Sequence, residues 1–329
     1  MRQTIIRFFV GKGGVGKTTC AAAYALRKAR EGYRTLIVSL DPAHNLGDVF
    51  DTELGDEPRT IESNLVAIEV DYDAMIRKHL KTLGERIKDI YGYLRVLNLD
   101  KYIDVLKHAP GIEEQAVLDR IVEIVKDYVF RKSVDVLVFD TPPTGLTLRI
   151  MALPAISLIW ISKLMELRLA ILDRRKAIAR VLGERRWEVV VAGHRIELPI
   201  DVAEDPIFQE LKKLYEEYSM IHSVLTNKDM SSVIIVVNPE TLPIVEAKRA
   251  YDFLSKLGIS VSYLIVNKVL KLHAVSNELR QKLTEQERAL SLVHQLFSGM
   301  NVVEVPYLPF EPRGIEALEK LAQILKSVE

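Results

Sequence analysis

The sequence predicts an α/β protein built on a doubly wound, mostly parallel sheet, with an inserted α-helical subdomain. Three observations support this fold class. Short apolar runs alternate along the chain with helical patterns, which is typical of a parallel sheet covered by helices. A glycine-rich loop separates the first apolar run from the first helical pattern. Two longer helical segments interrupt the alternation, and we expect them to form the inserted subdomain.

The predicted strands are short and nearly continuous apolar runs, the pattern of strands that are buried on both faces. They lie at residues 5–10, 35–40, 134–139, 233–237, 262–266 and 302–305. Helical patterns lie at residues 19–30, 242–257, 274–297 and 313–328. No linker-like stretch divides the chain, so we predict a single domain over residues 1–329.

The two interrupting segments are expected at about residues 73–110 and 154–227. The first carries one apolar stripe at helical spacing, on a helix or on two helices broken near Gly92. Its members are Ile76, Leu80, Leu83, Ile87, Ile90, Leu94 and Leu97. The stripe alone favours a buried core over a binding groove. In the second segment, residues 187–191 and 195–200 are predicted to pair as a hairpin around Gly193.

Composition excludes several classes of protein. The net charge is zero, which argues against a nucleic-acid partner. Cys20 is the single cysteine, so one chain holds neither a disulfide nor a cysteine metal cluster. The longest uncharged apolar run, residues 150–162, contains Pro154 and is too short to span a bilayer. The chain starts without an apolar signal segment, and we expect a cytoplasmic protein.

The glycine-rich loop has the sequence GKGGVGKTT at residues 11–19. A strand, such a loop and a helix form the context of a phosphate-binding P-loop, so the predicted fold is that of a P-loop nucleoside triphosphatase. Lys17 is placed to reach the β- and γ-phosphates, and the Thr18 hydroxyl is placed to bind Mg²⁺. The expected nucleotide-binding residues of the loop are Gly13, Gly14, Val15, Gly16, Lys17, Thr18 and Thr19.

Two aspartates each follow an apolar run, at the sheet edge where doubly wound folds bind ligands. Asp140 fits the Walker B pattern, in which the carboxylate holds Mg²⁺, often through water. Asp41 is the predicted catalytic residue, which would orient water in line with the γ-phosphate. The alternative for Asp41 is that it only caps the turn before Pro42.

Other polar and aromatic residues at strand ends allow two interpretations each. The amide of Asn267 is either a reader of the adenine edge or an ordinary turn residue, and Glu240 is similar. The stretch that holds Pro309 and Phe310 is either a surface for a purine ring or a strand terminator.

Several motifs resemble those of one family. KGGVGKT, which begins at Lys12, resembles the deviant Walker A motif of dimeric ATPases similar to MinD, ParA and the nitrogenase iron protein. Within that group the chain resembles the family of ArsA-type ATPases and ATPases for guided entry of tail-anchored proteins. DPAHNLGDVF at 41–50 looks like its switch I, and DTPPTGLTLR at 140–149 looks like its switch II. Shorter matches in family order lie at 110–114, 239–240, 265–267 and 309–314.

The resemblance implies a homodimer in which Lys12 reaches the nucleotide of the partner subunit and acts in catalysis. It implies Asp41 as the activator of water and Asp140 on the Mg²⁺ side. It also places Glu240 and Asn267 at the ribose and base, with Pro309 and Phe310 beside the adenine. ATP and Mg²⁺ are the implied cofactors. The two insertions become a candidate groove for a hydrophobic helix.

The chain departs from the family in its cysteines. Arsenite-pump members bind the metalloid through several cysteines, and many tail-anchor members hold a zinc with a Cys-x-x-Cys pair, whereas this chain has Cys20 alone. The predicted function is a Mg²⁺-dependent ATPase whose homodimer closes on ATP to capture the transmembrane helix of a tail-anchored protein. The alternatives are an arsenite- or anion-transport ATPase and a positioning switch similar to MinD or ParA.

Overall fold

The computed structural model describes residues 3–43, 45–90, 106–107, 109–182, 187–191, 194–271 and 277–328. The chain divides into two compact units. The first, here the core unit, comprises Met1–Tyr72, Glu123–Met151 and Val224–Glu329. The second, here the helical unit, comprises Asp73–Val122 and Ala152–Ser223. The helical unit therefore holds most of the two segments that interrupt the strand and helix alternation, and it also includes the chain up to Val122.

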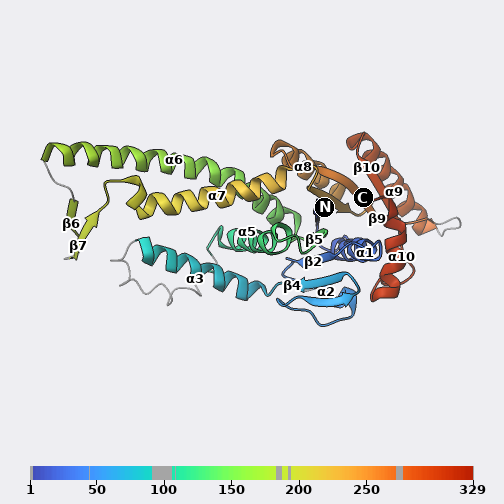
Figure 1. Ribbon diagram of the computed structural model, residues 1–329. Coiled ribbons are helices and arrows are strands. Elements are labelled where there is room, and N and C mark those ends of the chain that lie inside the picture. Colours follow the sequence, from blue (N-terminus) through green and yellow to red (C-terminus); the bar gives the residue numbers. More distant parts are fainter. Residues whose placement is uncertain are drawn as a thin grey trace. The chain divides into compact units, whose positions relative to one another are not determined.

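The core unit contains an eight-stranded sheet in the order β10-β9-β8-β1-β5-β2-β4-β3 (Figure 1). All neighbouring strands are parallel except β3, which runs antiparallel to β4. The predicted doubly wound, mostly parallel sheet is confirmed. Its strands are β1 (Ile5–Gly11), β2 (Thr35–Ser39), β3 (Arg59–Glu62), β4 (Leu65–Glu69), β5 (Val136–Asp140), β8 (Ser231–Val237), β9 (Val261–Val269) and β10 (Asn301–Pro306).

Strand β1 lies between β5 and β8, so the chain winds outward from β1 in both directions. In such sheets the ligand crevice lies outside the carboxyl ends of the strands, at the point where the winding reverses. The end of β1 is the start of the glycine-rich loop. The topology therefore puts that loop at the expected ligand edge.

The helices of the core unit pack on this sheet. They are α1 (Lys17–Arg30), α2 (Leu46–Phe50), α8 (Thr241–Lys256), α9 (Asn277–Leu296) and α10 (Ile315–Ile324). Helix α1 is buried almost throughout, and its small apolar residues join α10 and alternate strand residues in one cluster. Phe8 stacks on Phe139 with ring centroids 4.9 Å apart. Truncating either ring to alanine is expected to cost about 3–5 kcal/mol, so these contacts fix β1 beside β5.

The helical unit is formed by α3 (Tyr72–Ile90), α5 (Ile112–Ile124), α6 (Thr144–Leu182) and α7 (Pro206–Thr226), all four of which extend across the boundary into the core unit. The predicted hairpin is present as β6 (Trp187–Val191) paired antiparallel with β7 (His194–Leu198). The stripe from Ile76 to Ile90 lies on α3, with Leu80 buried and Leu83 exposed. Leu94, Leu97 and Gly92 lie outside the described residues.

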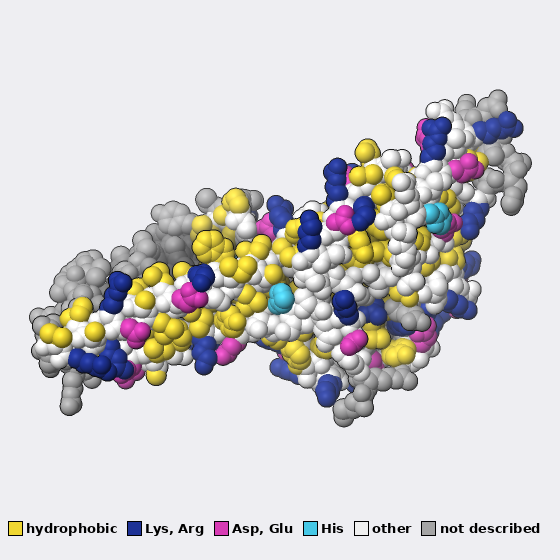
Figure 2. Space-filling model, turned by 90° about the horizontal axis from the view of Figure 1, so that it is seen from above, with side chains coloured by type: hydrophobic (Ala, Val, Ile, Leu, Met, Phe, Trp, Pro, Cys, Tyr) yellow, Lys and Arg dark blue, Asp and Glu magenta, His cyan; other side chains and the backbone are white. Residues whose placement is uncertain are grey.

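Helix α6 differs from the expectation. It runs without a break through Pro154, and its stretch Thr144–Val181 is, by length and composition alone, long and apolar enough to cross a membrane. This stretch is longer than the uncharged apolar run at residues 150–162, because Lys163 and Glu166 interrupt its apolar residues. Only 33% of the apolar window is buried. Figure 2 shows apolar side chains gathered along this helix.

Candidate nucleotide-binding site

The glycine-rich loop joins β1 to α1 and contains two glycines in the left-handed backbone conformation. Gly14 and Gly16 have φ values of 80° and 88°, a conformation that side chains with a Cβ adopt only under strain. A Cβ on Gly11 would meet the Val236 carbonyl oxygen at 2.7 Å, so β1 and β8 also require glycine there. The loop ends at Gly16, the N-cap of α1. A helix N-terminus that opens on such a loop favours an anionic ligand.

Lys17 joins the two predicted aspartates. Its Nζ lies 2.9 Å from Asp41 Oδ2 and 2.7 Å from Asp140 Oδ1. Lys17 and Asp140 are buried, and Ser39 Oγ donates to Asp140 Oδ2 at 3.3 Å. Burial raises the pKa of Asp140 above its usual value, and the ammonium of Lys17 opposes that shift. The Thr18 hydroxyl also bonds Asp140, so the residues expected to hold Mg²⁺ lie together.

Asp41 caps the turn before Pro42 and also contacts Lys17, while its role in orienting water stays a prediction. Its Oδ1 accepts a hydrogen bond from the Ala43 N–H at 3.1 Å, which is the turn-capping contact. Its Oδ2 meanwhile faces the buried ammonium of Lys17. The turn therefore holds the carboxylate at the phosphate end of the site.

A cavity of about 530 Å³ lies over the loop. It is lined by Lys12, Gly13, Gly14, Gly16, Lys17, Thr18, Thr19, Asp41, Ala43, Asn45, Asp48, Val49, Pro143, Glu311, Pro312 and Arg313. The first predicted switch thus faces the loop across one cavity. Lys12 is largely exposed, and its Nζ lies 3.5 Å from Glu246 Oε1 on α8. An exposed pair of this kind contributes little stability, so it leaves Lys12 able to change partner.

A neighbouring cavity of about 460 Å³, here the base cavity, shares Gly16, Thr19, Glu311 and Pro312 with the first. It is lined in addition by Asn267, Lys268, Pro306, Tyr307, Leu308, Pro309, Phe310 and Leu321. Asn267, Pro309 and Phe310 therefore lie together, next to the loop. An apolar pocket with one amide beside a phosphate cradle fits a nucleotide base.

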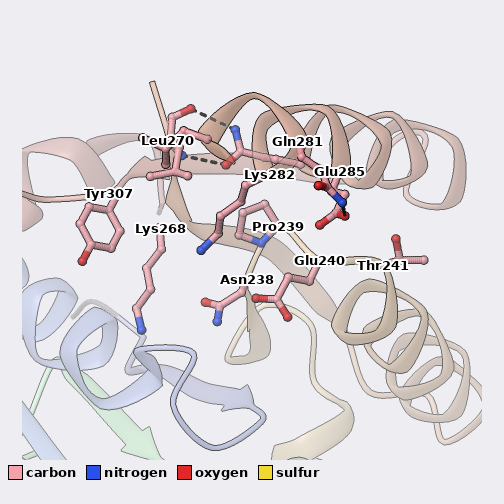
Figure 3. A pocket seen from close by; sticks show the side chains of 12 residues that line it. Asn238, Pro239, Glu240, Thr241, Lys268, Leu270, Gln281, Lys282, Glu285 and Tyr307 are labelled. Carbon is pink, nitrogen blue, oxygen red and sulfur yellow. Dashed lines mark hydrogen bonds between the residues drawn. The ribbon is translucent and has the colours of Figure 1, made fainter. Parts of the chain in front are cut away.

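The structure does not bring Glu240 to either cavity. Glu240 lines a third cavity of about 660 Å³, together with Asn238, with Lys268 of β9 and with several residues of α9 that include Gln286 (Figure 3). The buried Oδ1 of Asn238 has no hydrogen-bond partner among the described residues. The contact of Glu240 with ribose stays a prediction. Within one chain, Glu240 lies outside both the cavity over the glycine-rich loop and the base cavity.

The sequence analysis missed residues that fix the switches in place. Glu69 is buried at the end of β4, and its Oε1 accepts the backbone N–H groups of Leu46 at 2.8 Å and Gly47 at 3.4 Å. This carboxylate caps α2, the helix that follows Asp41. The sequence contains a pattern that could have predicted this role, because Glu69 is an acidic residue at the end of an apolar run, as Asp140 is.

Buried hydroxyls anchor the second predicted switch. Thr141 Oγ1 donates to the Phe9 carbonyl at 2.8 Å, and Thr147 Oγ1 lies 3.0 Å from Thr141 Oγ1. Both threonines are buried. They join the segment after Asp140 to β1, the strand that carries the glycine-rich loop.

The loop beside the base cavity is bonded to α2. Gly314 N–H donates to the Val49 carbonyl at 2.9 Å, and Arg313 forms a 3.0 Å ion pair with Asp51. Both contacts lie within the core unit. They connect the chain that lines the base cavity with the end of the helix that follows Asp41.

The described residues contain no group of three or more histidine, cysteine, aspartate or glutamate side chains that could hold a metal. The sole cysteine, Cys20, is buried on α1, and burial raises its pKa to about 12. A thiol in this state does not form the thiolate that binds metals and metalloids.

The sheet and the loop at its central strand define a P-loop nucleoside triphosphatase. The match to the anion-transporting ATPases covers residues 4–327, and the chain belongs to this family, the ArsA ATPases. The resemblance identified from the two switches is therefore confirmed. Family membership implies the use of a nucleotide and, in most members, of Mg²⁺.

Relatives cover nearly the whole chain. A protein of Aquifex aeolicus, provisionally named arsenical pump-driving ATPase 1, is 30% identical over 97% of this chain and 78% of its own length. A protein of Chlorobaculum tepidum with the same kind of name is 32% identical over 95% of this chain and 73% of its own. A second Aquifex aeolicus protein is 28% identical over 97% of this chain and 98% of its own.

Proposed function

We propose that the chain is a Mg²⁺-dependent ATPase of the cytoplasm that binds and releases the hydrophobic transmembrane helix of tail-anchored proteins. ATP-driven closure of a homodimer would control the binding. The observation that carries the proposal is an exposed apolar stripe on α6, defined by Ile156, Ile159, Trp160, Leu164, Leu167, Ile178 and Val181.

The stripe has the dimensions of a membrane-spanning helix. Five members lie one to four residues apart between Ile156 and Leu167. Ile178 and Val181 follow after a gap of 11 residues and return to the same side of α6 at 3.6 residues per turn. From Ile156 to Val181 the stripe spans about 38 Å at the rise of an α-helix. The hydrocarbon core of a bilayer is about 30 Å thick. Trp160 is 67% exposed and Val181 is 85% exposed, which is unusual for a packing face.

The rest of α6 is held so that the stripe faces outward. Ile161, Leu172 and Ala179 are buried on another side of the helix. Arg168 forms a two-pronged ion pair with buried Asp205, and Lys176 Nζ lies 2.8 Å from Asp201. These contacts bond a different side of α6 to the segment before α7, so the stripe is free to bind a partner helix.

The chemistry of the site suits hydrolysis of a phosphoanhydride. Lys17 would leave the aspartates for the β- and γ-phosphates, and Thr18 with Asp140 would hold the Mg²⁺ that neutralises developing charge. Asp41 would orient water for attack on the γ-phosphorus. Lys12, exposed and weakly paired, would reach the nucleotide of the partner subunit.

A second candidate function is an ATPase for arsenite or another anion. It is favoured by the names of the relatives, which are arsenical pump-driving ATPases. The state of Cys20 argues against metalloid binding, because its thiol is buried and its pKa is about 12. The MinD-like alternative is disfavoured, because α10 buries Leu318 and Leu321 in the core and offers no membrane helix.

The test is capture of a synthetic transmembrane helix by the purified full chain, with and without ATP. We expect an ATP-dependent complex, and we expect Leu167→Lys to weaken capture about tenfold by placing a charge in the apolar stripe. Asp173→Lys is the matched control, because Asp173 is exposed on another side of α6. Equal capture by both variants, or none by the unaltered protein, would overturn the proposal.

A further inference from the structure

Strand β9 contains a bulge beside the glycine-rich loop. Val266 is paired with Glu304 and Val269 with Pro306, so two residues of β9 lie opposite one residue of β10. Lys268, one of the two, has a φ of 61°. A lysine in the left-handed region is held there by its surroundings and often marks a functional site. Bulges commonly redirect a side chain in this way.

The bulge lets two consecutive side chains contact the same loop. In a regular strand, neighbouring side chains point to opposite faces. Here Asn267 Nδ2 donates to the Val15 carbonyl at 2.8 Å, and Lys268 Nζ donates to the Gly14 carbonyl at 2.9 Å. Figure 3 shows the Lys268 side chain extending toward the loop before α1.

These two contacts determine where the loop's N–H groups point. The peptide bonds of the described chain are all trans, and in a trans peptide the carbonyl and the following N–H point in opposite directions. Holding the Gly14 and Val15 carbonyls from the β9 side therefore turns the N–H groups of Val15 and Gly16 the other way. The Val15 N–H has only a long bond, 3.4 Å, to the Lys12 carbonyl, so it can turn to a phosphate.

We propose that Lys268 is a positioning residue of the phosphate-binding loop, which holds the Gly14 carbonyl so that the loop is ordered before a nucleotide binds. The inference rests on the proposed binding of ATP and deepens it. The lysine is exposed, so its bond is worth a few-fold in affinity. Because the contact acts on the loop, ADP and ATP gain equally from it.

The experiment measures the Kd of ADP and ATP for the purified full chain and three variants. Lys268→Met removes the ammonium, and Lys268→Arg keeps a cationic donor. Lys268→Gly removes the side chain but suits the positive φ. We expect the methionine and glycine variants to raise both Kd values about 3- to 10-fold, with arginine close to the unaltered protein. Lys271→Met, at an exposed lysine just after β9, is the matched control and should change neither Kd.

Amide hydrogen exchange of residues 12–16 without nucleotide provides the second measurement. The positioning role predicts faster exchange in Lys268→Met and Lys268→Gly than in Lys271→Met. A purely structural bulge predicts normal nucleotide binding by Lys268→Gly, which would overturn the inference. A direct phosphate contact predicts a larger loss for ATP than for ADP, and that result would also overturn it.

The failure of this inference is distinguishable from that of the proposed function. If the unaltered chain binds ADP and ATP but Lys268→Met binds them equally well, only the role of Lys268 is wrong. If the unaltered chain binds neither nucleotide, the proposed function and the inference fall together.

Discussion

The ammonium of Lys17 lies 2.7 Å from Asp140 Oδ1, and both groups are buried at the junction of β1, β5 and α1. Lys17 also contacts Asp41, so one cation is shared by two carboxylates. If a nucleotide with Mg²⁺ binds as we propose, it brings an anion for Lys17 and a cation for Asp140. We expect this exchange of partners to release Asp41 from the lysine.

The role of Asp41 can be tested with Asp41→Asn. The amide keeps the turn contact to Ala43 but is a far weaker base and carries no charge. We expect ATP to bind with a similar Kd, while steady-state phosphate release falls about 100-fold or more. Asp229→Asn, at an exposed turn of the core unit, is the control. Hydrolysis near the normal rate in Asp41→Asn would contradict the assignment.

The burial of Asp140 predicts a pH dependence of stability. Because burial raises the pKa of this carboxyl above 3.8, the folded state holds the proton more tightly than the unfolded state. This contribution to stability is present below pH 3.8 and is lost as pH rises through the folded pKa. The stability of Asp140→Asn relative to the unaltered chain should therefore increase with pH.

Urea unfolding of both proteins at pH 4 and pH 7 checks this prediction. The quantity to compare is the difference in the free energy of unfolding between variant and unaltered protein. A difference that is the same at the two pH values, or smaller at pH 7, would show that Asp140 is not penalised by burial.

Glu69→Ala removes the acceptor of two backbone N–H groups at the start of α2. Because these groups are buried, we expect the free energy of unfolding to fall by about 1–3 kcal/mol. Glu69→Gln keeps one acceptor oxygen and should lose less. Glu57→Ala, at an exposed glutamate before β3, is the control for urea unfolding. Equal stability of Glu69→Ala and Glu57→Ala would show that the cap does not stabilise α2.

Cys20 should be inert in the folded protein. With a pKa of about 12, its thiol is protonated between pH 7 and 9 and is also inaccessible. We expect no reaction with a thiol-specific chromogenic disulfide at pH 8, and one thiol per chain in guanidinium chloride. By the same reasoning arsenite should leave the rate of ATP hydrolysis unchanged. Rapid labelling of the native protein would contradict this prediction and would favour the alternative in which Cys20 binds arsenite.

The parts of the site that the sequence predicted share one physical origin. Residues at the carboxyl ends of parallel strands meet at one sheet edge, which is why Asp41 and Asp140 were expected beside the loop and lie there. The edge strand β3 and its neighbour β4 were not predicted, because four- and five-residue runs carry a weak pattern. Because Glu69 ends β4, its hydrogen bonds to the start of α2 were not predicted either.

Other contacts depend on partners far along the chain. The bulge at Lys268 arises from the register between β9 and β10, and one sequence does not reveal register at this precision. Glu240 was grouped with the nucleotide residues from family order, whereas within one chain it lines a separate cavity. Its role, like those of Lys12 and the groove, stays a prediction.

The bonds from Arg313 and Gly314 to the end of α2 affect how future variants are interpreted. One continuous piece of chain lines the base cavity at Pro309 and Phe310 and then bonds the helix that follows Asp41. A substitution made there to alter base preference is also expected to disturb the helix that follows Asp41, the residue proposed to orient water. Changes in nucleotide preference and changes in the rate of hydrolysis are therefore expected to appear together. An affinity measurement alone would not detect the change in rate.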